Sequence, residues 1–347
     1  MQDHAAATPA VPDDIRDRAR RRAEARAARD WALADQLRGE IEAAGWKVVD
    51  RGTDFVLEPS HPPDVREQGR VRYGASASVP SRLAEPASAS ATIVVQADRW
   101  PDDLARALGG LRAFAPAATQ VVIVANAPTP EQAAALGEPA GPARLPIGGI
   151  IPEQVWTSAP LGHATATNMG IRRAAADVIV LLDTSLEPTG DFVTPVVDAL
   201  ADPGVAVAGG WGIVSGDLRH FEDAPAGVVD AVEGYCLAFR RRDFAARGPL
   251  DEHFRFYRNL DIWWSLVLRD EGEDTPSRRA MCLPDLPLLR HAHRGYTSVE
   301  DTERDRLSRR NFYRIIDRFG RRLDLLVQPA RGNGARANGK SGSATGA

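Results

Sequence analysis

One segment, residues 161–191, restricts the fold more than any other part of this 347-residue sequence. Small and apolar residues recur in it at helical spacing, and the apolar run over 178–182 then has the length of a buried parallel strand. Asp183 stands where this strand ends, and Asp191 is a suitable cap for a helix over 192–200. Because ligands bind at the carboxyl ends of strands in open α/β sheets, Asp183 is placed for chemistry, although an ordinary crossover with a surface aspartate has the same pattern.

Several residues of this segment form a motif: Gly162, Ala166, Asn168, Gly170, Ala174 and the step Leu182-Asp183. Together they resemble the core signature of family 2 glycosyltransferases, in which a helix with an Asn-x-Gly step leads into a strand that ends in an Asp-x-Asp metal motif. Residues 228–242, 248–252 and 254–272 resemble the acceptor half of that family, so the resemblance extends over about residues 91–320. The sequence departs from the family at Ser185, which takes the place of the second acid.

The resemblance implies a fold and an activity. The expected fold is a Rossmann-like α/β domain of the GT-A type, which binds nucleotide-diphospho-sugars, behind a small N-terminal helical hairpin and β-hairpin. The expected activity is that of a hexosyltransferase-like enzyme, which moves a sugar from a nucleotide-sugar donor to a hydroxyl group of a glycan, lipid or small-molecule acceptor. A single displacement with inversion is expected because the motifs offer only one carboxylate base.

The first β-α-β unit of this domain is predicted from periodicity. Residues 91–96 and 120–125 read as strands, and Pro101 opens a helix over 102–114 between them. This unit therefore predicts two parallel strands whose carboxyl ends lie side by side.

In the resembling family the ends of these two strands hold the base and the ribose of the nucleotide. The resemblance therefore places Ala97, Asp98 and Asn126 beside the nucleotide, although Asn126 also fits a plain turn, since Asn-Ala-Pro is a turn signal. Asn168 is a further candidate for a nucleotide contact, or else it ties down the loop at Gly162.

A divalent cation, Mg²⁺ or Mn²⁺, is expected beside the leaving diphosphate, because a cation stabilises the negative charge that develops there. The expected ligand of the ion or of the diphosphate is Asp183. Since Ser185 supplies no charge, the ion is expected to bind mainly together with the phosphates. His291 and His293 are candidates for the same pocket, because a His-x-His step on a strand places both rings on one face. His293 is the preferred second ligand.

Deprotonation of the acceptor hydroxyl requires a positioned carboxylate. Asp261 begins an apolar helix after an aromatic turn, where the resembling family carries its catalytic acid, and it is the expected base. The N-terminus of that helix is expected to hold the carboxylate and to lower its pKa. A first-turn aspartate without a catalytic role has the same pattern. Glu233 and Asp251 are expected contacts of the acceptor, and at least one of the adjacent Trp263 and Trp264 is expected in the core.

A separate N-terminal unit is predicted from composition. Arginines crowd the first half of a helical stretch over 14–44, and a β-hairpin follows across residues 51–53. A second group of residues is recognisable here: Arg26, Ala27, Ala28, Asp30, Trp31, Ala32, Ala34, Asp35, Arg38, Ile41, Gly45, Asp50, Gly52 and Thr53. They resemble the small C-terminal domain of cysteinyl-tRNA synthetases, without any catalytic motif of a synthetase. A hairpin for packing or dimerisation is favoured here over weak RNA contact through the arginine-rich helix.

Composition also divides the rest of the chain. Residues 60–90 are rich in Pro, Ser and Ala, which predicts a flexible linker, and the Gly-rich end over 327–347 predicts a disordered tail. The expected domains are therefore a small appendage over 1–59, that linker, a glycosyltransferase domain over 91–326 and that tail.

The remaining composition excludes several classes of protein. A net charge of -4, 44% hydrophobic and 26% charged residues are typical of a globular protein and give no general attraction to nucleic acid or anionic membranes. The sequence has no run of about 18 apolar residues for a membrane span, and its N-terminus does not read as a signal peptide. Cys236 and Cys282 are expected as reduced core residues, and a cytoplasmic location is expected with them.

Two other functions stay open. A non-catalytic nucleotide-sugar-binding protein on a transferase scaffold is one, because Ser185 and Asn126 stand where the family usually has acids. Turnover of any nucleotide sugar excludes it. An RNA-associated adaptor led by the arginine-rich helix is the other, and a steep loss of tRNA affinity with salt supports it.

Overall fold

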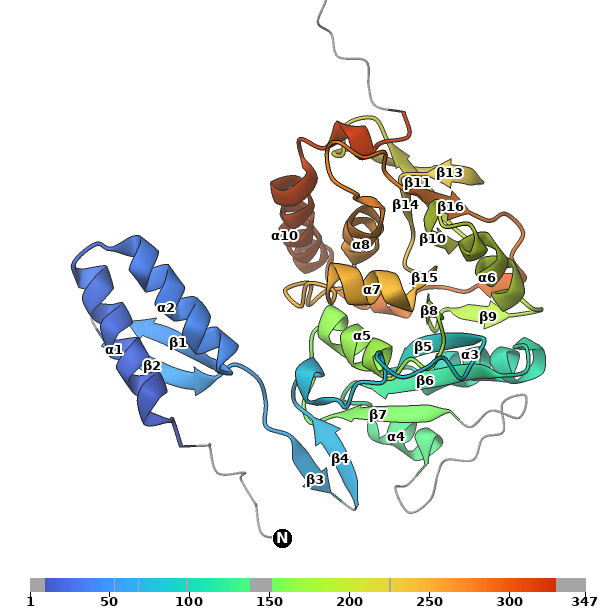
Figure 1. Ribbon diagram of the computed structural model, residues 1–347. Helices are drawn as coiled ribbons and strands as arrows, with labels where there is room; N and C mark the ends of the chain where they lie inside the picture. Colours follow the sequence, from blue (N-terminus) through green and yellow to red (C-terminus); the bar gives the residue numbers. More distant parts are fainter. Residues whose placement is uncertain are drawn as a thin grey trace, which may run out of the picture.

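The computed structural model describes residues 10–328 except 53, 68, 98, 138–151 and 225. Within the described residues, the main domain is built on one sheet in the order β13-β16-β10-β15-β8-β5-β6-β7-β4-β3 (Figure 1). Its strands are β3 (Val65–Glu67), β4 (Arg70–Tyr73), β5 (Ala91–Ala97), β6 (Thr119–Ala125), β7 (Glu153–Thr157), β8 (Val178–Leu182), β10 (Val205–Gly209), β13 (Gly227–Val229), β15 (Cys236–Arg240) and β16 (Arg279–Cys282). Strands β4, β7, β6, β5 and β8 are parallel, whereas β15 is antiparallel to both β8 and β10.

Helices cover both faces of this sheet, because successive residues of a strand point to opposite sides. In β5, Val94 belongs to one apolar cluster, and Ile93 and Val95 belong to the other. The face of Val94 is covered by α5 (His163–Arg172), α7 (Arg241–Arg247), α8 (Leu260–Arg269) and α10 (Asp301–Phe319). The face of Ile93 is covered by α3 (Pro101–Phe114), α4 (Pro130–Leu136) and α6 (Val193–Ala201). Short helical turns are α9 (Arg294–Thr297), η1 (Ser76–Ser78) and η2 (Leu323–Leu325).

Two small antiparallel sheets lie next to the main sheet. One contains β12 (Phe221–Ala224), β11 (Gly212–Ser215) and β14 (Ala231–Val232), and the other pairs β17 (Leu288–Arg290) with β9 (Leu186–Pro188). The backbone N–H of His291 donates a 2.9 Å hydrogen bond to the carbonyl of Ser185. The pairing of β17 with β9 therefore returns the chain after Arg290 to the end of β8.

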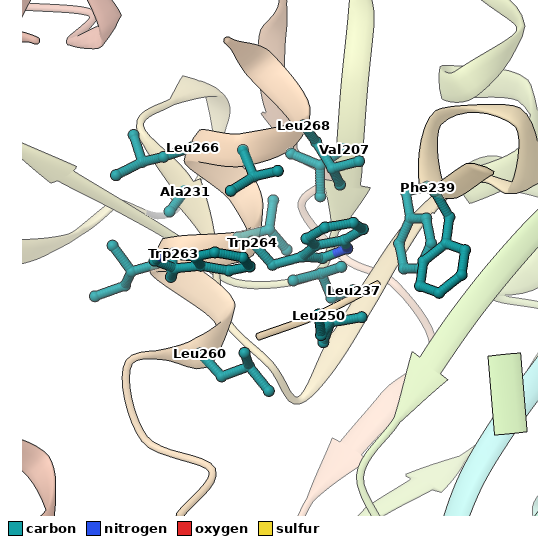
Figure 2. Packing of buried hydrophobic residues seen from close by; sticks show 14 of the residues in the cluster. Val207, Ala231, Leu237, Phe239, Leu250, Leu260, Trp263, Trp264, Leu266 and Leu268 are labelled. Carbon is teal, nitrogen blue, oxygen red and sulfur yellow. The ribbon is translucent and has the colours of Figure 1, made fainter. Parts of the chain in front are cut away.

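The core on the α8 side is rich in aromatic residues, and Figure 2 shows Trp264 beside Phe239. These two rings meet edge to face at 5.5 Å, and Trp263 packs against Phe254 at 5.6 Å. Trp263 is 6% and Trp264 1% exposed, so both tryptophans are core residues, in agreement with the expectation that at least one is. Their packing fixes α8 and, with it, Asp261 in the first turn.

The N-terminal unit consists of α1 (Asp13–Ala27), α2 (Trp31–Ala43), β1 (Trp46–Arg51) and β2 (Asp54–Pro59). The helical stretch is divided because Arg29 has a left-handed backbone with φ of 60° and Asp30 caps α2 by accepting a hydrogen bond from the N–H of Leu33. Ile15, Ala19, Ile41 and Trp46 form an apolar cluster that is separate from those of the main domain. This unit, which we call the N-terminal module, stands to one side in Figure 1 and matches the predicted helical hairpin and β-hairpin.

Residues 60–90 are not a flexible linker throughout, contrary to the expectation from composition. Strand β4 extends the main sheet beside β7, and Val79 is buried in the main core. The side chains of Arg172 and Arg173 donate hydrogen bonds to the carbonyls of Val79 and Pro80. Because the end of α5 satisfies these backbone groups, much of the Pro- and Ser-rich segment is fixed against the main domain. Composition alone does not reveal such partners.

Three further sequence-based expectations concern the ends, the thiols and the membrane. Most of the predicted tail, residues 329–347, lies outside the described residues. Cys236 and Cys282 are buried and form no disulfide within the described residues, as expected. Among the described helices, none combines the length and the apolar character that crossing a bilayer requires.

Candidate functional site

A cleft of 820 Å³ opens at the carboxyl ends of β5, β6 and β8. Gln96, Asn126 and Asp183 line it from these three strand ends. The opposite wall comes from the β11–β12 hairpin, the start of β15, the first turn of α8 and one side of α10. The fold thus brings the two halves of the sequence motif, which lie far apart along the chain, to one cavity.

Asp183 lies at the end of β8, where the sequence predicts it. Its Oδ1 accepts a 2.8 Å hydrogen bond from the backbone N–H of Ser185, and its Oδ2 lies 3.3 Å from Nε2 of His293. Burial raises the pKa of the Asp183 carboxyl, but the hydrogen bond and charge of His293 and the contacts with Ser185 outweigh burial, so the pKa lies below its usual range. Asp183 is therefore ionised at neutral pH, and both of its oxygens are already engaged.

His293 precedes α9 and caps it. Its Nδ1 accepts a 2.9 Å hydrogen bond from the N–H of Tyr296, so the neutral ring carries its hydrogen on Nε2. Burial lowers the pKa of His293, but Asp183 raises it by more. Protonation of Nδ1 would end its hydrogen bond from Tyr296, whereas Nε2 carries a hydrogen in both forms and lies 3.3 Å from Asp183. Tyr257 stacks on the same ring with a centroid distance of 4.7 Å.

The side chains around Asp183 do not fit the predicted metal site. A histidine ligand must offer a nitrogen lone pair, whereas Nε2 of His293 carries a hydrogen in this geometry. The role of His293 as a metal ligand stays a prediction, and it requires the ring to lose its hydrogen bond from Tyr296. Ser185 adds no charge to that of Asp183. Among the described residues, no group of three His, Cys, Asp or Glu side chains is arranged to hold an ion. A single engaged carboxylate is a poor donor set for Mg²⁺ or Mn²⁺.

The two histidines of the His-x-His step separate. Nε2 of His291 lies 2.7 Å from a carboxylate oxygen of Glu187, and His291 is not among the residues that line the cleft. Strand β17 ends at Arg290, so the alternation that would place both rings on one face no longer applies. Of these two residues, only His293 reaches the cleft.

Asp261 lies in the first turn of α8 and lines the cleft, as predicted. Its Oδ2 accepts a 2.8 Å hydrogen bond from the N–H of Gly234, and its Oδ1 accepts one of 2.9 Å from the N–H of Ile262. Burial raises the pKa of Asp261 by more than these N–H groups lower it. The expectation of a lowered pKa is therefore wrong, because the loss of solvation outweighs the helix N-terminus.

Glu233 precedes Gly234 and lines the same part of the cleft. Burial, followed by the charge of Asp261, raises the pKa of Glu233 to about 7, and Arg290 and Arg258 oppose this shift. The cleft thus contains two carboxyl groups whose pKa values are both raised. Carboxyl groups whose pKa values are raised towards neutral pH suit acid–base chemistry.

Asp251 is not part of this centre. Its carboxylate accepts a hydrogen bond from the N–H of His253 and pairs with Arg314 of α10 at 2.8 Å. Asp251 is also absent from the lining of the cleft. The structure therefore places this residue in a turn held against α10, and the expected contact with an acceptor is not supported by its position.

The residues predicted beside the nucleotide occupy different places. Asn126 lines the cleft, but its Oδ1 accepts a 2.9 Å hydrogen bond from the N–H of Leu161 and its Nδ2 donates one of 3.0 Å to the carbonyl of Leu161. Its amide therefore holds a loop, in line with the turn interpretation. Ala97 is 1% exposed and does not line the cleft, although its carbonyl accepts a hydrogen bond from the N–H of Asn126. Asp98 lies outside the described residues.

Asn168 is a structural residue rather than a nucleotide contact. It is 1% exposed, its Nδ2 donates a 2.9 Å hydrogen bond to the carbonyl of Leu250, and its Oδ1 accepts one of 3.0 Å from the N–H of Leu250. Both backbone groups are thereby satisfied inside the protein. Asn168 consequently ties α5 to the turn before Asp251, and not to the loop at Gly162.

Several cleft residues are missed by reasoning from the sequence. Arg219, Arg255 and Arg309 line the cleft, and within the described part of the chain their guanidinium groups form no ion pair or hydrogen bond. Tyr257 also lines it, and the aromatic turn over 254–258 is the signal that could have identified Tyr257 and Arg255. No local pattern distinguishes Arg219 and Arg309 from the many surface arginines of the chain.

Comparisons with known proteins support the fold. Residues 98–258 match the family model described as Glycosyl transferase family 2. The crystal structure of GalNAc-T7 with UDP, GalNAc and Mn²⁺ has a TM-score of 0.52 and is 13% identical, covering 66% of this chain and 48% of that one. The mannosyltransferase PcManGT from Pyrobaculum calidifontis in complex with GDP-Man and Mn²⁺ has a TM-score of 0.50 and is 16% identical, covering 72% of this chain and 71% of that one. The predicted α/β fold of the GT-A type is thereby confirmed.

One relative is similar to only a short part of the chain. The cysteine–tRNA ligase of Opitutus terrae is 46% identical over 50 residues, which are 14% of this chain and 11% of the ligase. This chain therefore spans about half of the GalNAc-T7 structure and a small part of the ligase.

Proposed function

We propose that this chain is a glycosyltransferase that moves a sugar from a nucleotide-sugar donor to a hydroxyl group of an acceptor. The observation that carries the proposal is a single cleft in which Asp183, at a strand end, meets Glu233 and Asp261, whose pKa values are raised. The family match over 98–258 and the GT-A fold support it.

The donor is proposed to be a hexose carried on uridine or guanosine diphosphate. Support comes from the two solved neighbours, which hold UDP and GDP-Man respectively. Donors of this kind place a diphosphate at the carboxyl ends of the strands, where open α/β sheets bind ligands. In this chain that position corresponds to the part of the cleft around Asp183 and His293.

The acceptor is activated by Asp261 in this proposal. A general base must be held rigidly within reach of the proton it removes, and the packing of α8 together with two backbone N–H groups fixes the Asp261 carboxylate. The acceptor oxygen attacks the anomeric carbon as its proton passes to Asp261, and the sugar leaves the diphosphate in one displacement with inversion. Glu233, whose pKa is raised to about 7, contacts the acceptor from the same wall.

Mn²⁺ accompanies the nucleotide in both solved neighbours, and a divalent cation is also what the sequence predicts for this chain. If such an ion binds here, Asp183 and the donor's own phosphates are its ligands, and it supplies charge to the leaving diphosphate. No step above depends on it, because the side chains around Asp183 do not fit a cation.

The test of the proposal is a thermal-shift screen with UDP-sugars and GDP-sugars, because a ligand that binds the native state raises the melting temperature by mass action. Stabilisation by at least one donor, and its loss in Asp183→Ala, are the expected results. Equal stabilisation of Asp183→Ala and the parent would show that the donor binds elsewhere. Release of nucleoside diphosphate by the chain then separates an enzyme from a binding protein on the same scaffold.

Contact of the N-terminal module with RNA is a separate and weaker proposal. Its support is the similarity over 50 residues to a cysteine–tRNA ligase. The charges of α1 are largely compensated, since Arg22 and Arg26 both pair with Asp50, and Arg18 pairs with Glu40. A module whose arginines are internally paired offers fewer free cations to phosphates, so packing or dimerisation remains the favoured role.

A further inference from the structure

Both oxygens of Asp183 lie next to polar groups of the protein. Oδ1 accepts a hydrogen bond from the N–H of Ser185, and Nε2 of His293 lies 3.3 Å from Oδ2. His293 is held in this orientation by its hydrogen bond from Tyr296 and by the stacked ring of Tyr257. His293 therefore occupies the side of Asp183 at which a cation would otherwise bind. A cation at Oδ2 would have to displace Nε2 of His293.

A buried hydroxyl group beside His293, that of Tyr257, has no hydrogen-bond partner within the described part of the chain, and Tyr257 lines the cleft. The hydroxyl group of Ser185 lies next to Asp183 in the same cleft. Buried polar groups without a partner are rare in folded proteins, so the Tyr257 hydroxyl next to a cavity indicates a polar ligand. A hydroxyl group donates readily to a phosphate oxygen.

Positive charge is also available in the same cleft. Arg219, Arg255 and Arg309 line it without an ion pair or side-chain hydrogen bond in the described residues, although arginines elsewhere in the chain are commonly paired with carboxylates. Arginine binds phosphate oxygens in a bidentate manner. The three side chains are exposed to solvent along the cleft, so their guanidinium groups are available to an anionic occupant.

We propose that the donor's diphosphate is bound by side chains of this chain, namely Ser185, Tyr257 and His293 together with the unpaired cleft arginines, and that transfer requires no divalent cation. This inference rests on the proposed function. The bond between the anomeric carbon and the diphosphate oxygen breaks, and its electron pair stays on that oxygen. The acceptor oxygen forms the new bond to carbon, and its proton passes to Asp261. Hydrogen bonds from the three side chains then stabilise the charge that the diphosphate gains.

The decisive experiment is calorimetric titration of the whole chain with UDP and with GDP, first in EDTA and then with Mn²⁺. We expect UDP or GDP to bind in EDTA with a Kd within about threefold of that measured with Mn²⁺. Binding that requires Mn²⁺ and disappears in EDTA overturns this inference and leaves the proposed function standing. If neither nucleotide binds under either condition, the proposed function fails and the inference fails with it.

Removal of single hydroxyl groups tests the site itself. Tyr257→Phe and Ser185→Ala each delete one donor, and each is expected to weaken nucleotide binding in EDTA about tenfold, because hydrogen bonds to charged groups are among the stronger ones. Tyr313→Phe is the matched control, since Tyr313 is 57% exposed on α10 and does not line the cleft. Unchanged affinity in both Tyr257→Phe and Ser185→Ala overturns the assignment.

A gain of metal dependence provides an independent test. Ser185→Asp adds a second carboxylate next to Asp183, so nucleotide binding is expected to fall in EDTA and to recover with Mn²⁺. The parent is expected to show no such recovery, and a parent that already behaves in this way contradicts the inference. Because the parent is measured in the same series, the comparison between EDTA and Mn²⁺ stands even if Ser185→Asp does not fold.

Discussion

The backbone N–H of Gly234 donates a 2.8 Å hydrogen bond to the carboxylate of Asp261, and this bond joins the start of β15 to the first turn of α8. Glu233, the residue before Gly234, is thereby placed beside Asp261. The charge of Asp261 is one of the causes that raise the pKa of Glu233 to about 7, after burial. One backbone hydrogen bond thus holds together two carboxyl groups whose pKa values are both raised, chiefly by burial.

The contribution of Glu233 to the stability of the chain is expected to fall as the pH rises from about 4.5 to about 7. The pKa of Glu233 is raised from 4.5 to about 7 in the folded state, so its contribution is fully present below about pH 4.5 and is lost as the pH rises to about 7. The free energy of unfolding lost in this way is at most about 3 kcal/mol. The real loss is smaller, because Glu233 is partly open to solvent. Glu233→Gln removes the titration, so its free energy of unfolding should fall less between about pH 5 and pH 8. Denaturant unfolding at both pH values measures this, and an identical pH dependence of variant and parent would contradict it.

Asp261→Asn keeps the size of the side chain but removes the proposed base. The transfer rate is expected to fall by about 10²–10⁴, while donor affinity is retained because the base contacts the acceptor. Asp251→Asn is the matched control, since Asp251 lies outside the cleft and is paired with Arg314. The measurement is a rate and a donor Kd for each variant. Near-parental turnover of Asp261→Asn together with an inactive Glu233→Gln would move the base to Glu233.

Asn168→Ala is expected to destabilise the fold without changing nucleotide affinity. The substitution leaves the N–H and carbonyl of Leu250 unsatisfied inside the protein, which costs about 2–4 kcal/mol. The free energy of unfolding and the Kd for UDP or GDP are measured on the same preparation. A large loss of affinity with unchanged stability would restore Asn168 as a nucleotide contact.

Deletion of residues 1–60 is expected to leave the main domain folded. The apolar cluster of the N-terminal module is its own, and β3 and β4, which belong to the main sheet, remain in the shortened chain. Thermal unfolding of the shortened and full chains should give similar main transitions. A shorter deletion, of residues 1–43, removes only the helices and serves as the control for exposing β1 and β2. Insolubility of the chain without residues 1–60 would show that the module supports the main domain.

The elements around the site could be predicted because their signals are local. The apolar run before Asp183 became β8, and Pro101 opened α3 at its first position, as the sequence indicates. The roles of the side chains were harder to predict from the sequence, because they depend on hydrogen-bond partners that lie far away along the chain. The side chain of Asn168 accepts a hydrogen bond from the backbone of Leu250, and that of Asn126 accepts one from the backbone of Leu161. The spacing of residues in the sequence predicts neither partner.

The electrostatics of the site could not be predicted in the same way. The sequence places Asp261 at a helix N-terminus, which suggests a lowered pKa, whereas burial by the surrounding core raises it. His293 was expected to offer a lone pair, but the cap on Tyr296 decides which nitrogen carries the hydrogen. The arginines of the cleft come from the β11–β12 hairpin, the turn before α8 and α10, so only the folded chain brings them together.

The sharpest measurement is the release of nucleoside diphosphate from a panel of UDP-sugars and GDP-sugars, with mixed glycan, lipid and small-molecule acceptors. The chain is expected to consume at least one donor and to release its UDP or GDP, and Asp261→Asn is expected to do so about 10²–10⁴ times more slowly. If no donor of the panel is consumed and none raises the melting temperature, the chain is not a glycosyltransferase of the proposed kind.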